Sequence, residues 1–238
     1  IEAESPCSEI LQIFQTSIHE SIKQLWKQPL EKLSYESAYL PFVFAKADDY
    51  YHRAYIDLYL YSTQKRNTVF LCPDLDARKN CLSTILHVLF VSMQKEELFV
   101  IDDLHFFEKQ WQTIHPDWIT LCDSTNTELI HNVFYYLKKQ KKEKILLITD
   151  LSKFLQEDEQ YSMLFHEILE HASMYEMHVI TFVSSCDALR YRDLVFLENR
   201  YVLQSDTLPQ IQQFLETGEK KICSTVNEGL CKMDHVLS

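Results

Sequence analysis

The sequence predicts an α/β fold, in which a mostly parallel β-sheet carries helices on both faces. Two observations predict it. The first is a series of short apolar segments typical of buried strands: Leu98–Ile101, Ile119–Cys122, Ile145–Ile148 and Val179–Val183. The second is that helical spacing fills the intervals, as between Leu129 and Leu137 or between Leu164 and Ala172. Strands and helices that alternate along a chain are typical of a parallel sheet covered on both sides.

The composition fits a globular domain and excludes several functions. Of 238 residues, 46% are apolar and 13% aromatic, which is enough for a large buried core. The net charge of −12 opposes binding to DNA or to an anionic membrane surface, so no nucleic-acid partner is expected. The only glycines are Gly218 and Gly229. A glycine-rich cradle for a phosphate or a dinucleotide is therefore excluded.

The cysteines and histidines indicate no metal site. The seven cysteines are odd in number and form no C-x-x-C motif, which favours buried free thiols over disulfides or zinc ligands. The ten histidines are spread out without the spacing of metal ligands. No apolar run approaches the roughly 18 residues of a membrane span. Because the chain begins at Ile1 rather than Met, we expect it to be part of a longer protein.

The chain divides into a lead-in over residues 1–40 and one domain over residues 41–238. Residues 5–28 have apolar positions at helical spacing, with Ser5 as a cap and Pro6 at the first helical position. A connector follows as far as residue 40, so the lead-in is interpreted as a linker helix from a preceding module. The alternating run from Tyr55 to Tyr61 indicates a packed strand or a protein-binding surface rich in tyrosine.

The stretch 67–90 has the order of a phosphate-binding P-loop: a short apolar strand, a polar loop at 73–80 and an amphipathic helix. A working loop, G-x-x-x-x-G-K-[ST], needs glycines so that backbone N–H groups can point at the phosphates, and a hydroxyl to hold Mg²⁺. In this frame Pro73 and Arg78 take the glycine positions, and Asn80 takes the hydroxyl position. Only Lys79 matches the motif.

These replacements remove the chemistry of a nucleotide site. Pro73 has no N–H to donate, and Arg78 does not readily adopt backbone angles reserved for glycine. Asp74 and Asp76 would repel a triphosphate. The prediction is a nucleotide-hydrolase scaffold that binds no ATP, needs no cofactor and has no catalytic residue.

Acidic residues follow two of the predicted strands, at Asp102, Asp103 and Asp150. An aspartate in this place holds Mg²⁺ in nucleotide hydrolases, or it caps the following helix or turn. Leu151 stands where a water-activating glutamate usually follows. Further along, Arg200–Leu203 is predicted as a strand and Leu208–Leu215 as a helix, while the run KKQKKEK at 138–144 is interpreted as a solvated helix end.

From about residue 40 onward the chain resembles an ATPase module of the FtsK/SpoIIIE class, as found in tandem in the type VII secretion ATPases, the EssC/YukB/EccC proteins. The opening segment of the domain, AKADDYYHRAYIDL, is followed in the family's order by the strand and loop KRNTVFLCPDLDARKN and the strand LFVIDDLHFF. KKEKILLITDLSKF resembles the Walker B strand, and the end from RYVLQSDTLPQIQ to NEGLCKM resembles the family's closing strand, helix and glycine turn, here Glu228-Gly229-Leu230. Both loop glycines and the catalytic glutamate are missing, as in a degenerate last module of the type VIIb branch.

The resemblance implies a RecA/FtsK-like P-loop fold and a role in export. Such modules are cytoplasmic parts of membrane-anchored, hexameric coupling proteins that export small helical-hairpin proteins of the WXG100 kind. It also implies a preceding ATPase module in the same chain and recognition of the exported proteins or their C-terminal signals. Pro73, Arg78, Lys79, Asn80 and Asp150 would be remnants of the nucleotide site. Two alternatives stay open: a competent but atypical ATPase, and an inactive scaffold of another assembly such as a clamp loader.

Overall fold

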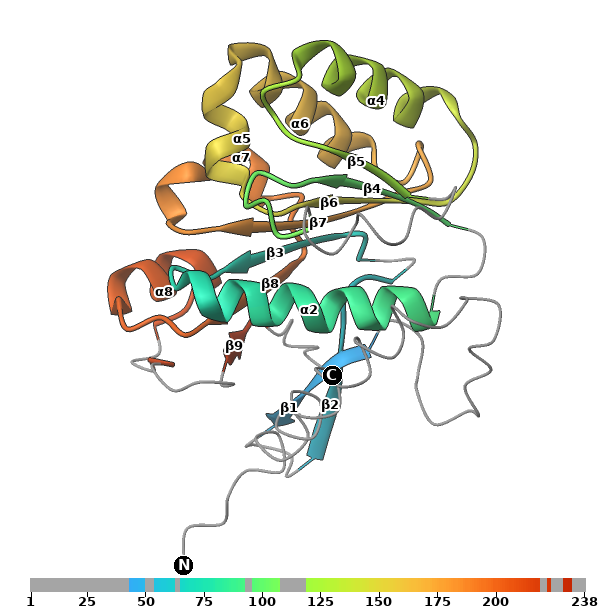
Figure 1. Ribbon diagram of the computed structural model, residues 1–238. Helices are drawn as coiled ribbons and strands as arrows, with labels where there is room; N and C mark the ends of the chain where they lie inside the picture. Colours follow the sequence, from blue (N-terminus) through green and yellow to red (C-terminus); the bar gives the residue numbers. More distant parts are fainter. Residues whose placement is uncertain are drawn as a thin grey trace, which may run out of the picture.

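The computed structural model describes residues 43–49, 54–62, 65–92, 96–107, 119–218, 222–223 and 229–232. The lead-in predicted over residues 1–40 lies outside these ranges. A seven-stranded sheet forms the centre of the molecule (Figure 1). Its strands, in spatial order, are β5 (Ile119–Cys122), β4 (Glu97–Ile101), β6 (Lys144–Ile148), β7 (Met177–Val183), β3 (Asn67–Leu71), β8 (Asn199–Leu203) and β9 (Gly229–Cys231).

The strands from β5 to β8 are all parallel to their neighbours, and only β9 pairs antiparallel, with β8. The prediction of a mostly parallel sheet is therefore confirmed, with all five predicted strands from β4 to β8 in place. A separate two-stranded sheet is formed by β1 (Val43–Asp49) and β2 (Ala54–Tyr59), which confirms the strand predicted near Tyr55.

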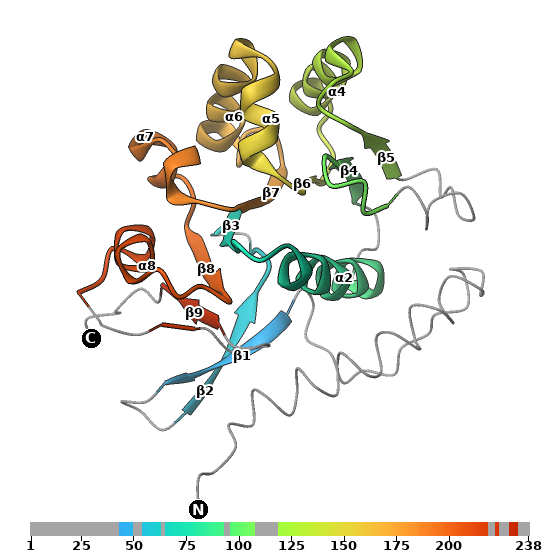
Figure 2. The same cartoon turned by 60° about the vertical axis from the view of Figure 1, so that its left-hand side comes forward.

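Helices cover both faces of the large sheet. On one face lies α2 (Leu75–Ser92). The opposite face carries α4 (Thr127–Lys139), α5 (Leu151–Glu157), α6 (Glu159–His171) and α8 (Leu208–Leu215), as the turned view in Figure 2 shows. After β7 come a 3₁₀ turn, η2 (Cys186–Ala188), and the short α7 (Tyr191–Leu194). None of the helices in the described part of the chain is both long and apolar enough to cross a membrane.

Alternation along the strands divides the core in two. Val69 and Leu71 of β3 pack in the cluster that includes α4, α5 and α6, whereas Phe70 packs in the cluster that includes α2. Successive side chains of a strand point to opposite faces, so a strand buried on both sides reads as a continuous apolar run. Every residue of β3, β6 and β7 is buried for this reason.

Two local predictions need correction. The run 138–144 is a helix end only as far as Lys139; Lys144 begins β6 and is fully buried. Its ammonium donates to the carbonyls of Gln140, Lys142 and Tyr175, so its three donors are satisfied, and burial lowers its pKa. Gly229 begins strand β9 rather than a turn, and a Cβ there would lie 2.9 Å from the carbonyl oxygen of Val202.

The free-thiol prediction is confirmed for the six cysteines that the structure describes. Four are buried and two are partly buried: Cys72, Cys122, Cys186 and Cys223, then Cys81 and Cys231. Burial raises the pKa of the Cys72 thiol to about 12, so this thiol stays protonated at neutral pH. It is therefore a packing group and a poor nucleophile.

Candidate functional site

The connection between β3 and α2 is shorter than the predicted loop. Only Cys72, Pro73 and Asp74 join the strand to the helix, so residues 75–80 are helical. Asp74 explains the early start: its Oδ1 accepts a hydrogen bond from the N–H of Ala77 at 2.7 Å, and its carbonyl accepts from the N–H of Arg78. This is the geometry of an N-cap. The prediction of a loop as far as Asn80 was wrong, because a capping aspartate was available and no glycine was present to hold a curled backbone.

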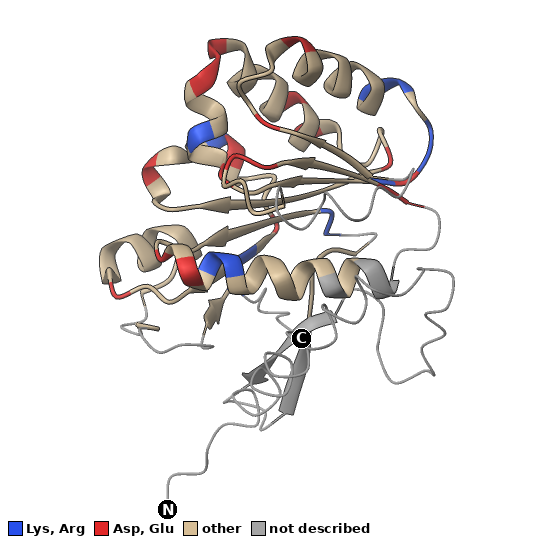
Figure 3. Cartoon of the chain, in the orientation of Figure 1, with Lys and Arg blue, Asp and Glu red and all other residues tan. Residues whose placement is uncertain are grey.

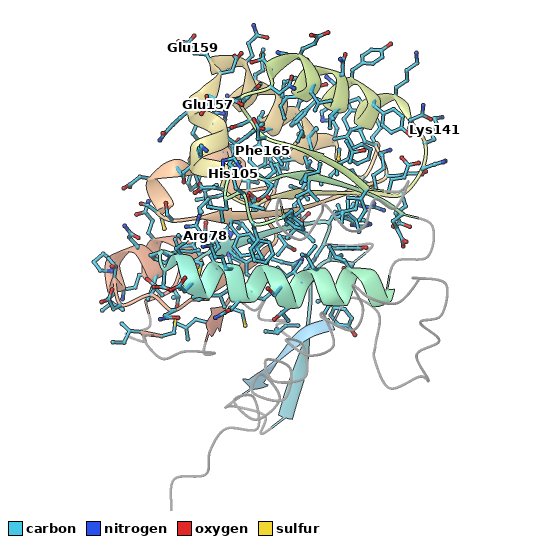
Figure 4. The ribbon with its side chains drawn as sticks, in the orientation of Figure 1. Arg78, His105, Lys141, Glu157, Glu159 and Phe165 are labelled. Atoms are coloured by element: carbon cyan, nitrogen blue, oxygen red, sulfur yellow. The ribbon has the colours of Figure 1, made fainter. Side chains whose placement is uncertain are left out.

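The side chain of Arg78 is buried beside this connection. Its side chain is 3% exposed, and Nη1 donates to Oδ2 of Asp150 at 2.9 Å. The carbonyl of Cys72 accepts from Nε at 3.3 Å and from Nη2 at 2.8 Å. Figure 4 labels Arg78 beside the first turns of α2. One guanidinium therefore joins the ends of β3 and β6, two strands with β7 between them.

Asp150 has two roles. Its Oδ1 accepts from the N–H of Lys153 and caps α5, while Oδ2 accepts from Arg78. The capping interpretation of this aspartate is thus confirmed. The contact with Arg78 was not predicted. Sequence spacing alone does not show that the side chain of Arg78, after β3, reaches an aspartate that follows β6.

The other residues of the predicted site lie apart from this pair. Pro73 and Asn80 are exposed, and Lys79 is half-buried. Lys79 has no side-chain hydrogen bond or ion pair with any residue in the ranges that the structure describes. The structure therefore brings together Arg78 and Asp150, and leaves Lys79 on the second turn of α2 rather than at the mouth of a loop.

Asp102 and Asp103 accept hydrogen bonds that stabilise the segments after β4 and β5. Asp102 Oδ2 accepts from the N–H of Phe107 at 2.7 Å, and Oδ1 accepts from Thr149 Oγ1. Burial raises the pKa of the Asp102 carboxyl. Asp103 Oδ1 accepts from both the N–H and the hydroxyl of Ser124, which ties the end of β4 to the end of β5. Both aspartates are 4% exposed.

An aspartate follows every one of the parallel strands, and the sequence analysis missed this pattern. Because carboxyl ends of parallel strands meet at one edge of a sheet, these residues share that edge. They are Asp74, Asp102, Asp103, Asp123, Asp150, Asp187 and Asp206. Figure 3 shows acidic segments at this edge, on the left of the sheet. The signal was available, since each apolar segment runs into an aspartate within a few residues.

Comparison with known proteins gives fold relatives only. Neither the models of known protein families nor the curated proteins give a match to this sequence. Among solved structures, the chain is similar to the EssC ATPases 2 and 3 from Geobacillus thermodenitrificans, with a TM-score of 0.60 and 8% identity. That match covers 85% of this chain and 44% of the other. The cytoplasmic domain of the Thermomonospora curvata type VII secretion ATPase EccC has a TM-score of 0.55 and 9% identity, over 81% and 27% of the two chains.

A third similar structure comes from another system. It is the pCW3 conjugation coupling protein TcpA in a monomer form with ATPγS, with a TM-score of 0.52 and 10% identity, over 67% and 54% of the two chains. The chain thus spans less than two thirds of each of these proteins. At such identities the likeness shows the fold alone: the domain has the α/β fold of the ATPase domains in these structures, as the sequence predicts.

Proposed function

We propose that this domain is an ATPase-like module of a type VII secretion coupling protein that neither binds nor hydrolyses ATP. In place of nucleotide chemistry it serves in recognition of exported helical proteins and in assembly of the secretion machine. The fold shared with EccC and EssC modules supports the assignment to secretion. The single observation that carries the loss of nucleotide chemistry is the buried Arg78–Asp150 pair.

The pair stands where a nucleotide and its metal ion would act. In a working P-loop, backbone N–H groups surround the phosphates, and Mg²⁺ is held by the loop hydroxyl and a strand-end aspartate. Here a carboxylate oxygen of Asp150 already accepts from a guanidinium at 2.9 Å. The N–H groups of Ala77 and Arg78 are already bonded to Asp74. The Arg78 guanidinium therefore occupies the carboxylate that a metal ion would need, and the Asp74 cap occupies N–H groups that a phosphate would need.

Charge works in the same direction. The aspartates that follow the parallel strands form an acidic edge around the pair. A triphosphate carries several negative charges, so its approach to this edge is unfavourable. The net charge of −12 also opposes binding to nucleic acid.

The same proposal extends to the longer protein. The EssC structure contains two ATPase modules, which supports a preceding module in the same chain here. The whole protein would be membrane-anchored and hexameric, with this module in the cytoplasm. Its partners would be exported helical-hairpin proteins or their C-terminal signals.

The nucleotide test is titration calorimetry of the purified protein with Mg-ATP. We expect no heat of binding above dilution in the wild type or in Lys79→Ala. Saturable binding in the micromolar range that disappears in Lys79→Ala would favour the competent-ATPase alternative. A matched control is Lys139→Ala, at an exposed lysine of α4 away from the β3–α2 connection.

The recognition test is crosslinking of the protein to candidate exported helical proteins, with and without their last residues. We expect crosslinks with the full-length exported proteins and a large loss with the truncated ones. If none crosslinks while export still collapses when the module is deleted, the module acts as a spacer.

A further inference from the structure

The short helix α7 presents an apolar surface to solvent. Tyr191 is 79% exposed and Val195, directly after the helix, is 63% exposed. Val195 keeps helical backbone angles, so these two residues, four positions apart, lie on the same side of the turn. Figure 2 shows α7 at the outer edge of the layer formed by α5 and α6. We name Tyr191, Arg192 and Val195 the α7 surface.

A buried carboxylate holds this surface in place. Asp193 is 1% exposed, and its oxygens lie 2.7 Å from Nδ1 of His166 on α6 and 3.1 Å from Nε of Arg190. Arg190 also donates from Nη2 to the carbonyl of Ser162 on α6. From the other side, Arg200 of β8 donates to the carbonyl of Leu194 at 2.6 Å. The exposed side chains therefore stand on a fixed base, so little backbone entropy is lost when a partner binds.

Two arginines lie partly exposed at α7, although the chain as a whole is acidic. Arg190 is 43% exposed and Arg192 is 52% exposed, within a protein of net charge −12. Nε of Arg192 lies 3.8 Å from Asp193, beyond hydrogen-bond distance. Its guanidinium fork can therefore take a carboxylate from outside.

We propose that the α7 surface docks an acidic amphipathic segment of an exported protein. An apolar side chain of the segment packs on Tyr191 and Val195, and a carboxylate about one helical turn away pairs with Arg192. Exposed tyrosine beside arginine is the composition of binding hot spots, and a helix offers the required spacing of apolar and acidic groups. The inference rests on the proposed recognition function and gives it a place on the molecule.

The test uses a labelled helical peptide with leucines at positions i and i+4 and glutamates beside them, and a second peptide with glutamine in place of glutamate. Fluorescence anisotropy should show that the wild type binds the first peptide more tightly than the second. We expect about tenfold weaker binding in Tyr191→Ser and in Arg192→Glu. A peptide with lysine in place of glutamate should restore binding to Arg192→Glu. Tyr135→Ser is the matched control, because Tyr135 is a 62% exposed tyrosine on α4.

Several outcomes would overturn the inference. Two are equal affinity of the wild type for the two peptides and unchanged peptide binding in Arg192→Glu. A third is a wild-type oligomer that dissociates in Tyr191→Ser, measured by ultracentrifugation, which would assign the surface to a second copy. If exported proteins crosslink to the wild type and to Tyr191→Ser alike, recognition stands and this location fails. If they crosslink to neither while the peptide arm succeeds, the proposed function fails instead.

Discussion

Two arginine–aspartate pairs stand at different places in this fold and differ in which partner is buried. At the β3–α2 connection the arginine is the buried partner: Arg78 is 3% exposed and Asp150 18%. At α7 the aspartate is the buried partner: Asp193 is 1% exposed and Arg190 43%. A buried arginine packs against the protein around it, and its N–H groups donate to atoms inside the protein. A buried aspartate fixes a base and leaves cationic groups at the surface.

This difference decides what each region can do. Nε, Nη1 and Nη2 of Arg78 all donate to atoms of the protein, so a phosphate would have to displace existing bonds. The side chain of Arg192 is 52% exposed, and its Nε lies 3.8 Å from Asp193 rather than at hydrogen-bond distance. We therefore expect the first region to bind no nucleotide, although its fold is that of ATPases. The second is open, although nothing in its short helix resembles a known motif.

The largest effect should follow from removal of the buried guanidinium. Arg78→Met leaves the carboxylate of Asp150 and the carbonyl of Cys72 without their partner, and should lower the free energy of unfolding by about 3 kcal/mol. Lys79→Met is one position away, at a residue whose side chain has no hydrogen-bond or ion-pair partner among the described residues, and should change the free energy of unfolding by less than about 0.5 kcal/mol. Urea denaturation measures both. Equal effects of the two substitutions would mean that the pair does not hold the β3–α2 connection.

A smaller loss should follow at α7. Asp193→Asn keeps the size of the side chain and removes the charge that faces His166 and Arg190, which should cost about 2 kcal/mol. Asp187→Asn is the control, because Asp187 is exposed in η2. Thermal unfolding should show a lower Tm for Asp193→Asn alone. A similar shift in both variants would contradict a special role of the buried carboxylate.

The sequence was sufficient to predict the layers of the fold but not this pair of regions. Buried parallel strands read as apolar runs whatever surrounds them, so β4, β6 and β7 were located nearly to the residue. Burial of Lys144 was missed because one of its three carbonyl acceptors belongs to Tyr175, far along the chain. Charged residues in a run look solvated until the fold supplies partners.

The candidate site shows the same limit. The mismatch of Pro73 and Arg78 with a P-loop was visible in the sequence, since it depends on residue type alone. The contact of Arg78 with Asp150 joins positions 72 apart, and no spacing rule predicts it. The α7 surface was also missed, because exposure of Tyr191 depends on how α7 sits against α6.

Coupling energies can sharpen the comparison. In a double-mutant cycle with Arg78→Met and Asp150→Asn, the amide keeps an oxygen for the cap of α5 and removes only the charge. We expect a coupling of about 1–2 kcal/mol that changes little between low and high salt, because the pair is largely buried. Binding of the acidic peptide through exposed Arg192 should weaken clearly over the same range of salt. A coupling as salt-sensitive as peptide binding would mean that water reaches Arg78.

The smallest expected change in stability concerns a histidine at the opposite, amino-terminal edge of the sheet, away from both arginine–aspartate pairs. His178 of β7 is 1% exposed, its ring stacks on Tyr61 at 3.8 Å, and Nε2 lies 2.8 Å from Oε1 of Glu143. Burial lowers the pKa of His178; Arg66 acts in the same direction, while Glu143 and Glu96 oppose it. Because the folded protein binds this proton less readily than the unfolded chain, stability should fall as the pH drops below about 6.5, towards the lowered pKa. The slope for one proton is at most about 1.4 kcal/mol per pH unit.

His178→Phe keeps a flat ring against Tyr61 and removes the titrating group. Urea unfolding at pH values below and above 6.5 should therefore show a smaller loss of stability on acidification in this variant than in the wild type. His171→Gln, at a 40% exposed histidine of α6, is the control. If the loss on acidification is the same in His178→Phe as in the wild type, the acid sensitivity does not arise at His178.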